Sequence, residues 1–187
     1  MDKYASSQVT PAYTTDDYRY ALELTSARVD IEVPETVHIG DEWSFEFYVQ
    51  LTYDTAANYP ESEYLLTQPD CENGIHVESN EEYFNWFPIW PYPLIQLTSI
   101  YRIYPNRWTH YSFINDYALG EIRIIQYLYN YGEHYTATLT QKGANLCRNT
   151  PLVFAENSGF TTDMRISEFR FWNRVLQAER IYYNYNK

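Results

Sequence analysis

The sequence has no cluster of basic residues and no long apolar run. Its 13 Lys and Arg are outnumbered by 25 Asp and Glu, so the net charge is −12. Because phosphate binding needs clustered Lys and Arg, we expect no nucleic-acid partner, and an anionic membrane surface is disfavoured for the same reason. No stretch approaches the ~18 apolar residues of a membrane span, so we expect no membrane insertion. The acidity fits simple solubility or cation binding.

Glycine is scarce, with six residues in 187, and common motifs of phosphate-binding, catalytic and metal sites are missing. The sequence contains no glycine-rich phosphate loop, no G-x-S-x-G nucleophile elbow and no H-x-x-x-H metal spacing. Four histidines lie far apart, and we expect structural roles for them: His38, His76, His110 and His134. We therefore assign no catalytic residue and expect no enzyme, although a Ser-His-Asp set assembled from distant positions stays open.

Cysteine is confined to Cys71 and Cys147, both in turn-like text. At an extracellular address we expect a disulfide between them, which closes a loop of ~75 residues and stabilises by ~4 kcal/mol in the chain-entropy model. Two unrelated thiols are the alternative. Met1 to Ser7 has no apolar run, so we expect no signal peptide there. The chain is then either cytosolic or a mature or excised piece of a secreted protein.

Aromatic residues, in contrast, are abundant, with 21 Tyr, nine Phe and five Trp, and alternation of apolar and polar residues recurs along the chain. It is clearest in 28–33, in 43–52 and in 164–172. This period of two is typical of half-buried β-strands, whereas helical periodicity is confined to 173–183. About twelve candidate strands predict two packed antiparallel sheets.

The end of the chain carries a dense pattern in which an alternating strand runs directly into a short helical turn. Its residues fit "G-x-I-D-E-V-R-I-W-N-R-A-L-S-A-E-E-I" at twelve positions: Ile166, Glu168, Phe169, Arg170, Phe171, Trp172, Asn173, Arg174, Leu176, Ala178, Glu179 and Ile181. This ending resembles the close of the laminin-G-like, concanavalin-A-like jelly roll. Segments 29–34, 43–51 and 107–111 resemble other parts of that domain and occur in its order.

The resemblance covers about residues 20–183 and implies a fold and a kind of function. We expect an all-β domain, a two-sheet antiparallel jelly-roll β-sandwich with a short C-terminal helix, over residues 19–187. Residues 1–18 are polar and show little periodicity, and we interpret them as an N-terminal arm or linker. The family consists mostly of binding and cohesion modules and only sometimes of enzymes.

Segment 28–32 invites comparison with laminarinase-type glycosidases, which share the jelly-roll fold and carry "E-x-D-x-E" on one strand. Alternate residues of a strand share a face, so such a strand can supply nucleophile, helper and acid/base. Here Arg28 occupies the first position, and only Asp30 and Glu32 remain. The missing carboxylate argues against glycosidase activity.

Calcium is the only cofactor that the sequence leaves open. Several relatives of this fold bind Ca²⁺ through loop carboxylates and carbonyl oxygens, and the candidate loops here are 70–74, 115–116 and 159–163. Hard cations need about six oxygens, and none of these loops has a D-x-D-x-D array. Ordinary turn residues are the alternative, so no metal ligand is named.

The segment 83–93 is unusual because aromatic residues fall on both faces of an extended chain. Three prolines within six residues forbid a central paired strand there. Such an edge suits a protein interface or sugar rings stacked on Trp, with core packing as the other interpretation. The candidate interface or glycan-binding residues are Phe84, Trp86, Trp90 and Tyr92.

These observations predict a non-catalytic extracellular or cell-surface module for adhesion or assembly, as part of a larger secreted protein. Its partner would be another protein or a second copy of itself. The alternative is a carbohydrate-binding, lectin-like module that uses Ca²⁺ or acts without it. A glycosidase and a cytosolic structural subunit are weaker alternatives, the latter favoured if the two cysteines are distant and reduced.

Overall fold

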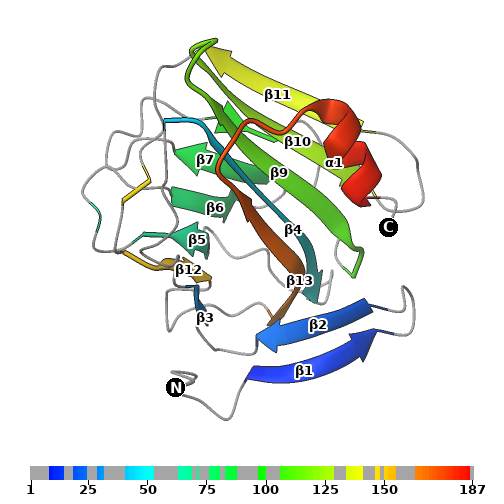
Figure 1. Ribbon diagram of the computed structural model, residues 1–187. Helices are drawn as coiled ribbons and strands as arrows, with labels where there is room; N and C mark the ends of the chain where they lie inside the picture. Colours follow the sequence, from blue (N-terminus) through cyan, green and yellow to red (C-terminus); the bar gives the residue numbers. More distant parts are fainter. Residues whose placement is uncertain are drawn as a thin grey trace.

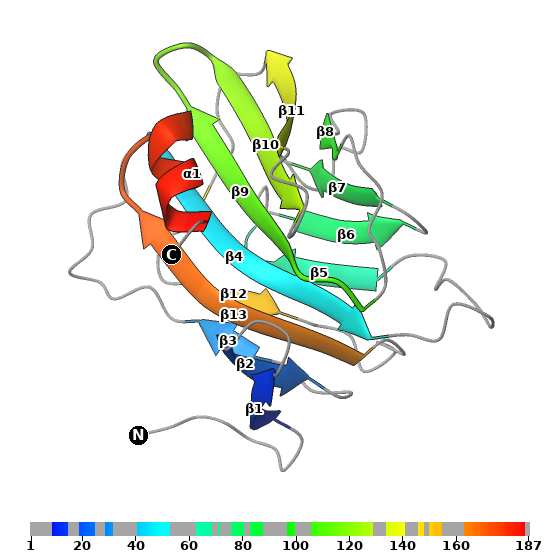
Figure 2. The same cartoon turned by 90° about the vertical axis from the view of Figure 1, so that its right-hand side faces the viewer.

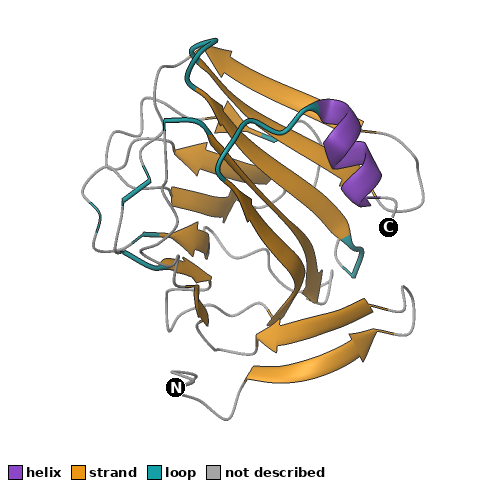
Figure 3. Cartoon of the chain, viewed as in Figure 1, coloured by secondary structure: helices purple, strands orange, loops and turns teal. Residues whose placement is uncertain are grey.

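The computed structural model describes residues 9–14, 19–24, 29–31, 41–52, 63–68, 71, 76–80, 83–87, 97–99, 106–128, 134–140, 146–147, 150–154 and 163–185. These residues form a β-sandwich with one short helix, as expected (Figure 3). Two antiparallel sheets pack face to face, and α1 (Ala178–Tyr185) lies on the opposite side of the larger sheet from the smaller one (Figures 1 and 2). The expected all-β jelly-roll architecture is confirmed.

The larger sheet has seven strands and the smaller has six. In spatial order the larger consists of β1 (Val9–Thr14), β2 (Arg19–Leu24), β13 (Asp163–Trp172), β4 (Trp43–Thr52), β9 (Thr109–Asp116), β10 (Glu121–Leu128) and β11 (His134–Thr140). The smaller consists of β3 (Val29–Ile31), β12 (Leu152–Phe154), β5 (Glu63–Thr67), β6 (His76–Asn80), β7 (Tyr83–Phe87) and β8 (Leu97–Thr98).

The segment interpreted as an N-terminal arm contains a strand. Val9–Thr14 forms β1, which pairs antiparallel with β2 from Val9 opposite Leu24 to Thr14 opposite Arg19. Pro11 has no N–H to donate, and β1 lies at the edge of the sheet, where a missing donor is tolerated. These six residues therefore extend the larger sheet, while the proposed division of the chain at residue 18 stays a prediction.

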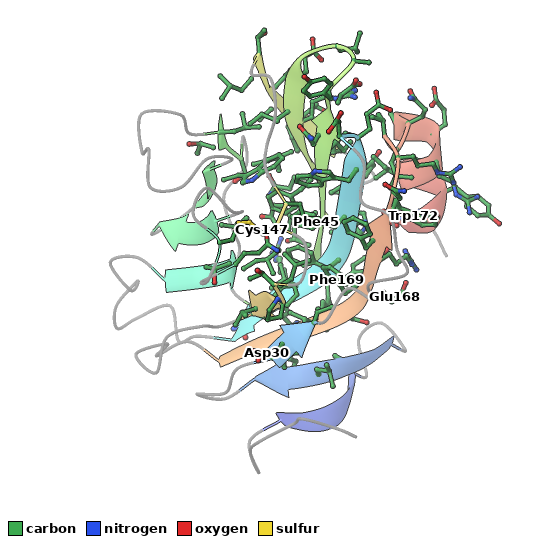
Figure 4. All side chains as sticks on the ribbon, turned by 60° about the vertical axis from the view of Figure 1, so that its left-hand side comes forward. Asp30, Phe45, Cys147, Glu168, Phe169 and Trp172 are labelled. Carbon is green, nitrogen blue, oxygen red and sulfur yellow. A yellow bond between two sulfur atoms is a disulfide. The ribbon has the colours of Figure 1, made fainter. Side chains whose placement is uncertain are left out.

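The main core fills the space between the sheets and is built from aromatic rings. Phe113 on β9 stacks on Phe45 and Phe47 of β4, with ring centroids 4.8 Å and 5.9 Å away, and meets Trp86 of β7 edge-on at 5.4 Å. All four side chains are fully buried. The alternation in 43–52 thus predicted the inward positions of β4 correctly (Figure 4 labels Phe45 and Phe169).

A β-bulge in β13 reverses the alternation near the C-terminus. Ser167 pairs with Tyr48 and Arg170 with Glu46, so two residues, 168 and 169, lie opposite one residue of β4. Glu168 adopts a φ of 52°, in the left-handed region that one type of bulge uses and that is uncommon outside glycine. The sequence suggested an unbroken alternation in 164–172, and the bulge corrects that interpretation.

The phase change decides which side chains reach the outer face of the larger sheet. Ile166 before the bulge, and Phe169 and Phe171 after it, all pack against the main core. Arg170 and Trp172 consequently point away from the smaller sheet, toward α1, and Trp172 packs against a second cluster there. Without the extra residue, these two side chains would face the aromatic core.

Candidate binding surface

The outer face of the larger sheet carries a second, smaller core beneath α1. Its apolar members come from the sheet, from the segment before the helix and from the helix: Ala21, Tyr48, Trp108, Ile114, Ile125, Tyr127, Leu176 and Ile181. Ile181 is fully buried, and Leu176 is nearly so. The helix is therefore fixed on the sheet by apolar contact over one face, while its opposite face meets solvent.

Polar contacts hold the chain on its way into α1. Ser44 Oγ donates to the carbonyl of Arg174 at 2.9 Å, and the Leu176 amide donates to the same Ser44 Oγ at 3.0 Å. Both bonds are formed by a side chain of β4 that is fully buried. They fix the position of residues 174–176 relative to the sheet.

Glu46 is the centre of a buried network beneath the helix. Its Oε1 accepts hydrogen bonds from Asn184 Nδ2 at 2.7 Å, from Trp172 Nε1 at 3.3 Å and from Arg170 Nη1 at 3.4 Å. Its Oε2 lies 3.4 Å from His110 Nε2. Glu46 and His110 are both fully buried, and Asn184 ties α1 directly to this carboxylate.

The surroundings of Glu46 favour its ionised form. Burial alone would raise its pKa, but polar contact with His110 and the charge of His110, followed by the charge of Arg170 and the hydrogen bond from Trp172, outweigh that effect. The pKa of Glu46 is consequently lowered from its ordinary value. The carboxylate remains charged at neutral pH and can bind all its donors at once.

The same face of the sheet brings together a serine, a histidine and a glutamate, which is comparable with the Ser-His-Asp set that the sequence left open but has Glu as its acid. His110 and Ser112 are alternate residues of β9, and Ser112 lies opposite Glu46 in register. However, no hydrogen bond involves Ser112 Oγ among the described residues, and all three side chains are fully buried. A nucleophile needs a partner base and access to substrate, so this geometry does not fit nucleophilic catalysis.

The exposed side of the C-terminal region is rich in aromatic rings and arginine. We call Trp172, Arg174, Arg180, Tyr182 and Tyr183 the α1 face. Tyr182 and Tyr183 are 53% and 50% exposed. The guanidinium of Arg174 lies 5.5 Å from the ring centre of Trp172, and that of Arg180 lies 5.1 Å from that of Tyr183. Each exposed arginine is thus held over a ring.

The two stacked pairs flank the same helix. Trp172 Nε1 and Asn184 Nδ2 donate to the same oxygen of Glu46, so the end of β13 lies against α1, and Figure 4 shows Trp172 beside the helix. Tyr183 directly precedes Asn184 in α1. The sequence analysis missed this surface because it treated 173–183 only as a short helical turn; the spacing of Arg180 and Tyr183 on one helix side was the available signal.

The expected aromatic interface in 83–93 has a different outcome for each residue. Trp86 is fully buried, and the centroid of its ring lies 6.0 Å from that of Trp43, which is the core packing that the sequence also allowed. It therefore offers nothing to a partner in this structure. The first part of this segment is not the edge that the sequence suggested, because β7 (Tyr83–Phe87) pairs with β6 on one side and with β8 on the other, and its prolines come only after the strand ends. Phe84 belongs to β7, while Trp90 and Tyr92 lie outside the described residues. An interface role for these three stays a prediction.

The expected disulfide is confirmed. Cys71 and Cys147 are bonded, with Cα atoms 5.9 Å apart across 76 positions of sequence, and no described cysteine is free. Gln68 supports the link, because its side chain donates to the carbonyls of Cys147 and Thr150 and accepts from the Cys147 amide. The bond ties the segment after β5 to the segment before β12, two neighbouring strands of the smaller sheet.

The candidate cation loop at 115–116 is occupied by internal contacts. Asp116 accepts hydrogen bonds from the Leu119 amide at 3.1 Å and from Arg123 Nη2 at 2.7 Å, and Asn115 donates to the carbonyl of Asp41 at 2.6 Å. The carboxylate thus closes the β9–β10 turn. Within the described ranges no three His, Cys, Asp or Glu side chains gather as a metal site. Loops 70–74 and 159–163 fall almost wholly outside those ranges.

The fold is similar to that of toxin binding domains. The receptor binding domain of botulinum neurotoxin D matches with a TM-score of 0.72 at 14% identity, over 97% of this chain and 46% of that one. The binding domain of Paraclostridial Mosquitocidal Protein 1 matches with a TM-score of 0.71 at 13% identity, over 96% and 46%. The receptor binding domain of the botulinum neurotoxin mosaic serotype C/D gives 0.71 at 14%, over 95% and 44%.

At these identities the likeness establishes the fold alone. The chain spans less than half the length of the solved structures that it matches. No family model and no curated protein matches the sequence. In the part of the chain that the structure describes, no helix is long and apolar enough to cross a bilayer.

Proposed function

We propose that this protein is a non-catalytic module that binds another protein at an extracellular or cell surface. The observation that carries the proposal is the α1 face, in which exposed Tyr and Arg side chains and the half-buried Trp172 lie on or beside a helix that Glu46 and a buried apolar cluster anchor. Trp, Tyr and Arg are the residue types that contribute most binding energy at protein interfaces. A rigid support limits the entropy lost when such a surface binds.

Further support comes from the fold and from the disulfide. The solved structures with this fold include receptor binding domains, which are binding proteins by their printed description. Disulfides persist in oxidising, extracellular compartments, so Cys71–Cys147 favours a secreted or surface address. The order of motifs that resembles laminin-G-like domains favours the same class of adhesive module, within a larger protein.

A lectin-like function is the second candidate, and one observation favours it. Tyr182 and Tyr183 present exposed rings beside Arg180, and carbohydrate sites combine an exposed ring with polar groups. The two functions differ in the ligand that is recognised. A lectin binds a free glycan, whereas a protein-binding module does not need one. Phe84, Trp90 and Tyr92 remain proposed contact residues for either function.

The test compares binding of the fluorescently labelled chain to a glycan array, with and without EDTA, and to intact cells before and after surface trypsin treatment. We expect no glycan signal and cell binding that trypsin abolishes. Reproducible binding to a glycan on the array would contradict the proposal and favour the lectin-like function. Loss of that binding in EDTA would show that it depends on Ca²⁺. The double variant Trp172→Ala/Tyr183→Ala should weaken cell binding, whereas Thr138→Ala, at an exposed position of β11, should leave it unchanged.

A further inference from the structure

In the part of the chain that the structure describes, the two sheets end in four edge strands, and β11 is the one without protection against further pairing. Proteins guard the unpaired N–H and C=O groups of an edge with short strands, prolines, charges or bulges. β3 and β8 have only three and two residues, and β1 contains Pro11. β11 has seven residues, His134–Thr140, with no proline and no Asp, Glu, Lys or Arg among them.

β11 is also regular along its whole length. It pairs with β10 from Thr140 opposite Glu121 to His134 opposite Tyr127 without a bulge. In an antiparallel pair, residues alternate between hydrogen-bonded and non-hydrogen-bonded positions, and the backbone groups at the latter turn away from the neighbour. Among the described residues, no backbone hydrogen bond reaches 136–140 from outside this pairing, and Figure 1 shows β11 as an outermost strand. Its outward backbone groups can therefore pair with one more strand.

Both faces of β11 suit a neighbouring strand. The outer face carries three exposed threonines, Thr136, Thr138 and Thr140. On the inner face, Ala137 is buried in the main core, whereas Tyr135 and Leu139 are only half-buried. An added strand would cover more of the apolar surface of these two side chains, and burial of apolar surface favours association.

We propose that β11 pairs antiparallel with β11 of a second copy of this chain, so that two seven-stranded sheets become one continuous sheet. A pairing centred on Ala137 is the one that uses all seven residues. It places Thr136 opposite Thr138 of the second copy, and threonine pairs across antiparallel strands are favourable. It also places Tyr135 opposite Leu139. Because both copies use the same strand, the contact is isologous and closes at a dimer.

The absence of charge in β11 favours a second copy as the occupant. The chain has 25 Asp and Glu and a net charge of −12, so two copies repel each other. Like charges directly opposite one another destabilise a strand pair, and the pairing of β11 with itself adds none. Charges more than about 8–10 Å apart are screened at physiological salt. The contact uses different residues from the α1 face and does not depend on the proposed function.

The experiment measures oligomer size by sedimentation velocity over a range of protein and NaCl concentrations. Wild type should shift from monomer to dimer as its concentration rises, without larger species. Its association should not weaken between about 50 mM and 500 mM NaCl, because no ion pair holds the contact and salt screens the repulsion. Thr136→Lys/Thr138→Lys places lysine opposite lysine at two points of the pairing and should weaken dimerisation by at least about tenfold.

The matched control is Thr136→Lys/Thr138→Glu, which changes the same two exposed positions but places lysine opposite glutamate. It should dimerise at least as well as wild type. The two variants differ only in the charge at position 138, so a difference between them tests the register as well as the strand. In wild type, hydrogen exchange of the amides in 134–140 should slow as the protein concentration rises.

Thermal melting of each variant checks the fold, and hydrogen exchange of wild type decides the matter if the variants are unfolded. The proposal would be overturned by a monomer at every concentration, by growth beyond a dimer or by association that salt weakens. Equal association of the two variants, or exchange in 134–140 that does not depend on concentration, would overturn it too. A monomer that still binds trypsin-sensitive sites on cells would remove only the β11 contact and leave the proposed function in place.

Discussion

The two faces of the larger sheet are built from the same strands but are held together in different ways. The inner face of β4 and β9 contributes Phe45, Phe47 and Phe113 to an aromatic core that the smaller sheet covers. The outer face of the same strands contributes Glu46 and His110 to a network that a single short helix covers. Alternation along a strand thus separates a region that gives stability from a region that positions a surface.

The largest expected effect breaks the inner face. Phe113→Ala removes a fully buried ring that contacts Phe45, Phe47 and Trp86, and we expect the free energy of unfolding to fall by about 3–5 kcal/mol. Chemical denaturation measures it. Ile181→Ala on the outer face is the comparison: it should expose the amides of α1 to hydrogen exchange while those of β9 and β10 keep their protection. If both substitutions unfold the protein globally to the same extent, the two faces are not separate units.

Most of the inner face was predictable, because the apolar residues of 43–52 repeat with the period of a strand and burial follows directly. The outer face was not. The direction of Arg170 and Trp172 depends on the bulge at Glu168, and a bulge does not change composition. Trp86 was ambiguous for a related reason: its neighbours are apolar on both faces of the strand, so alternation cannot show which face is buried.

The next effect concerns the smaller sheet, which has a covalent link between neighbouring strands. Cys71→Ser/Cys147→Ser should lower the free energy of unfolding by about 2–5 kcal/mol, since the unfolded chain loses a cross-link across 76 positions. Reduction of the wild-type protein should give the same loss in a melting experiment. The α1 face should keep its hydrogen-exchange pattern in the reduced protein below the melting temperature. Loss of protection in α1 before the smaller sheet would contradict the division between the two regions.

The third effect is a dependence of stability on pH, which we expect from the outer face and not from the inner face. Glu46→Gln keeps the size of the side chain but removes the charge that binds Arg170 and His110, and we expect a loss of about 2 kcal/mol at neutral pH. Because the pKa of Glu46 is lowered from 4.5 in the folded protein, the unfolded state binds its proton more readily. Its contribution is therefore complete above that ordinary value and disappears as pH falls through the lower, folded pKa.

Urea denaturation at several pH values measures this dependence. Wild type should lose more stability than Glu46→Gln as pH falls below 4.5, so the two curves should converge under acid conditions. Phe113→Ala is the control, because its cost should be the same at each pH. Curves for wild type and Glu46→Gln that stay parallel would show that the carboxylate is not ionised by its network.

The smallest effect tests whether the exposed arginines serve stability at all. Arg180→Gln breaks the stack on Tyr183, and since both side chains are solvent-exposed, the free energy of unfolding should change by about 0.5 kcal/mol or less. The same substitution in Arg174 should behave alike. A loss as large as that of Glu46→Gln would mean that the stacks hold the helix in place. A near-zero value leaves these charges without a structural task, which is the condition that a surface selected for binding should meet.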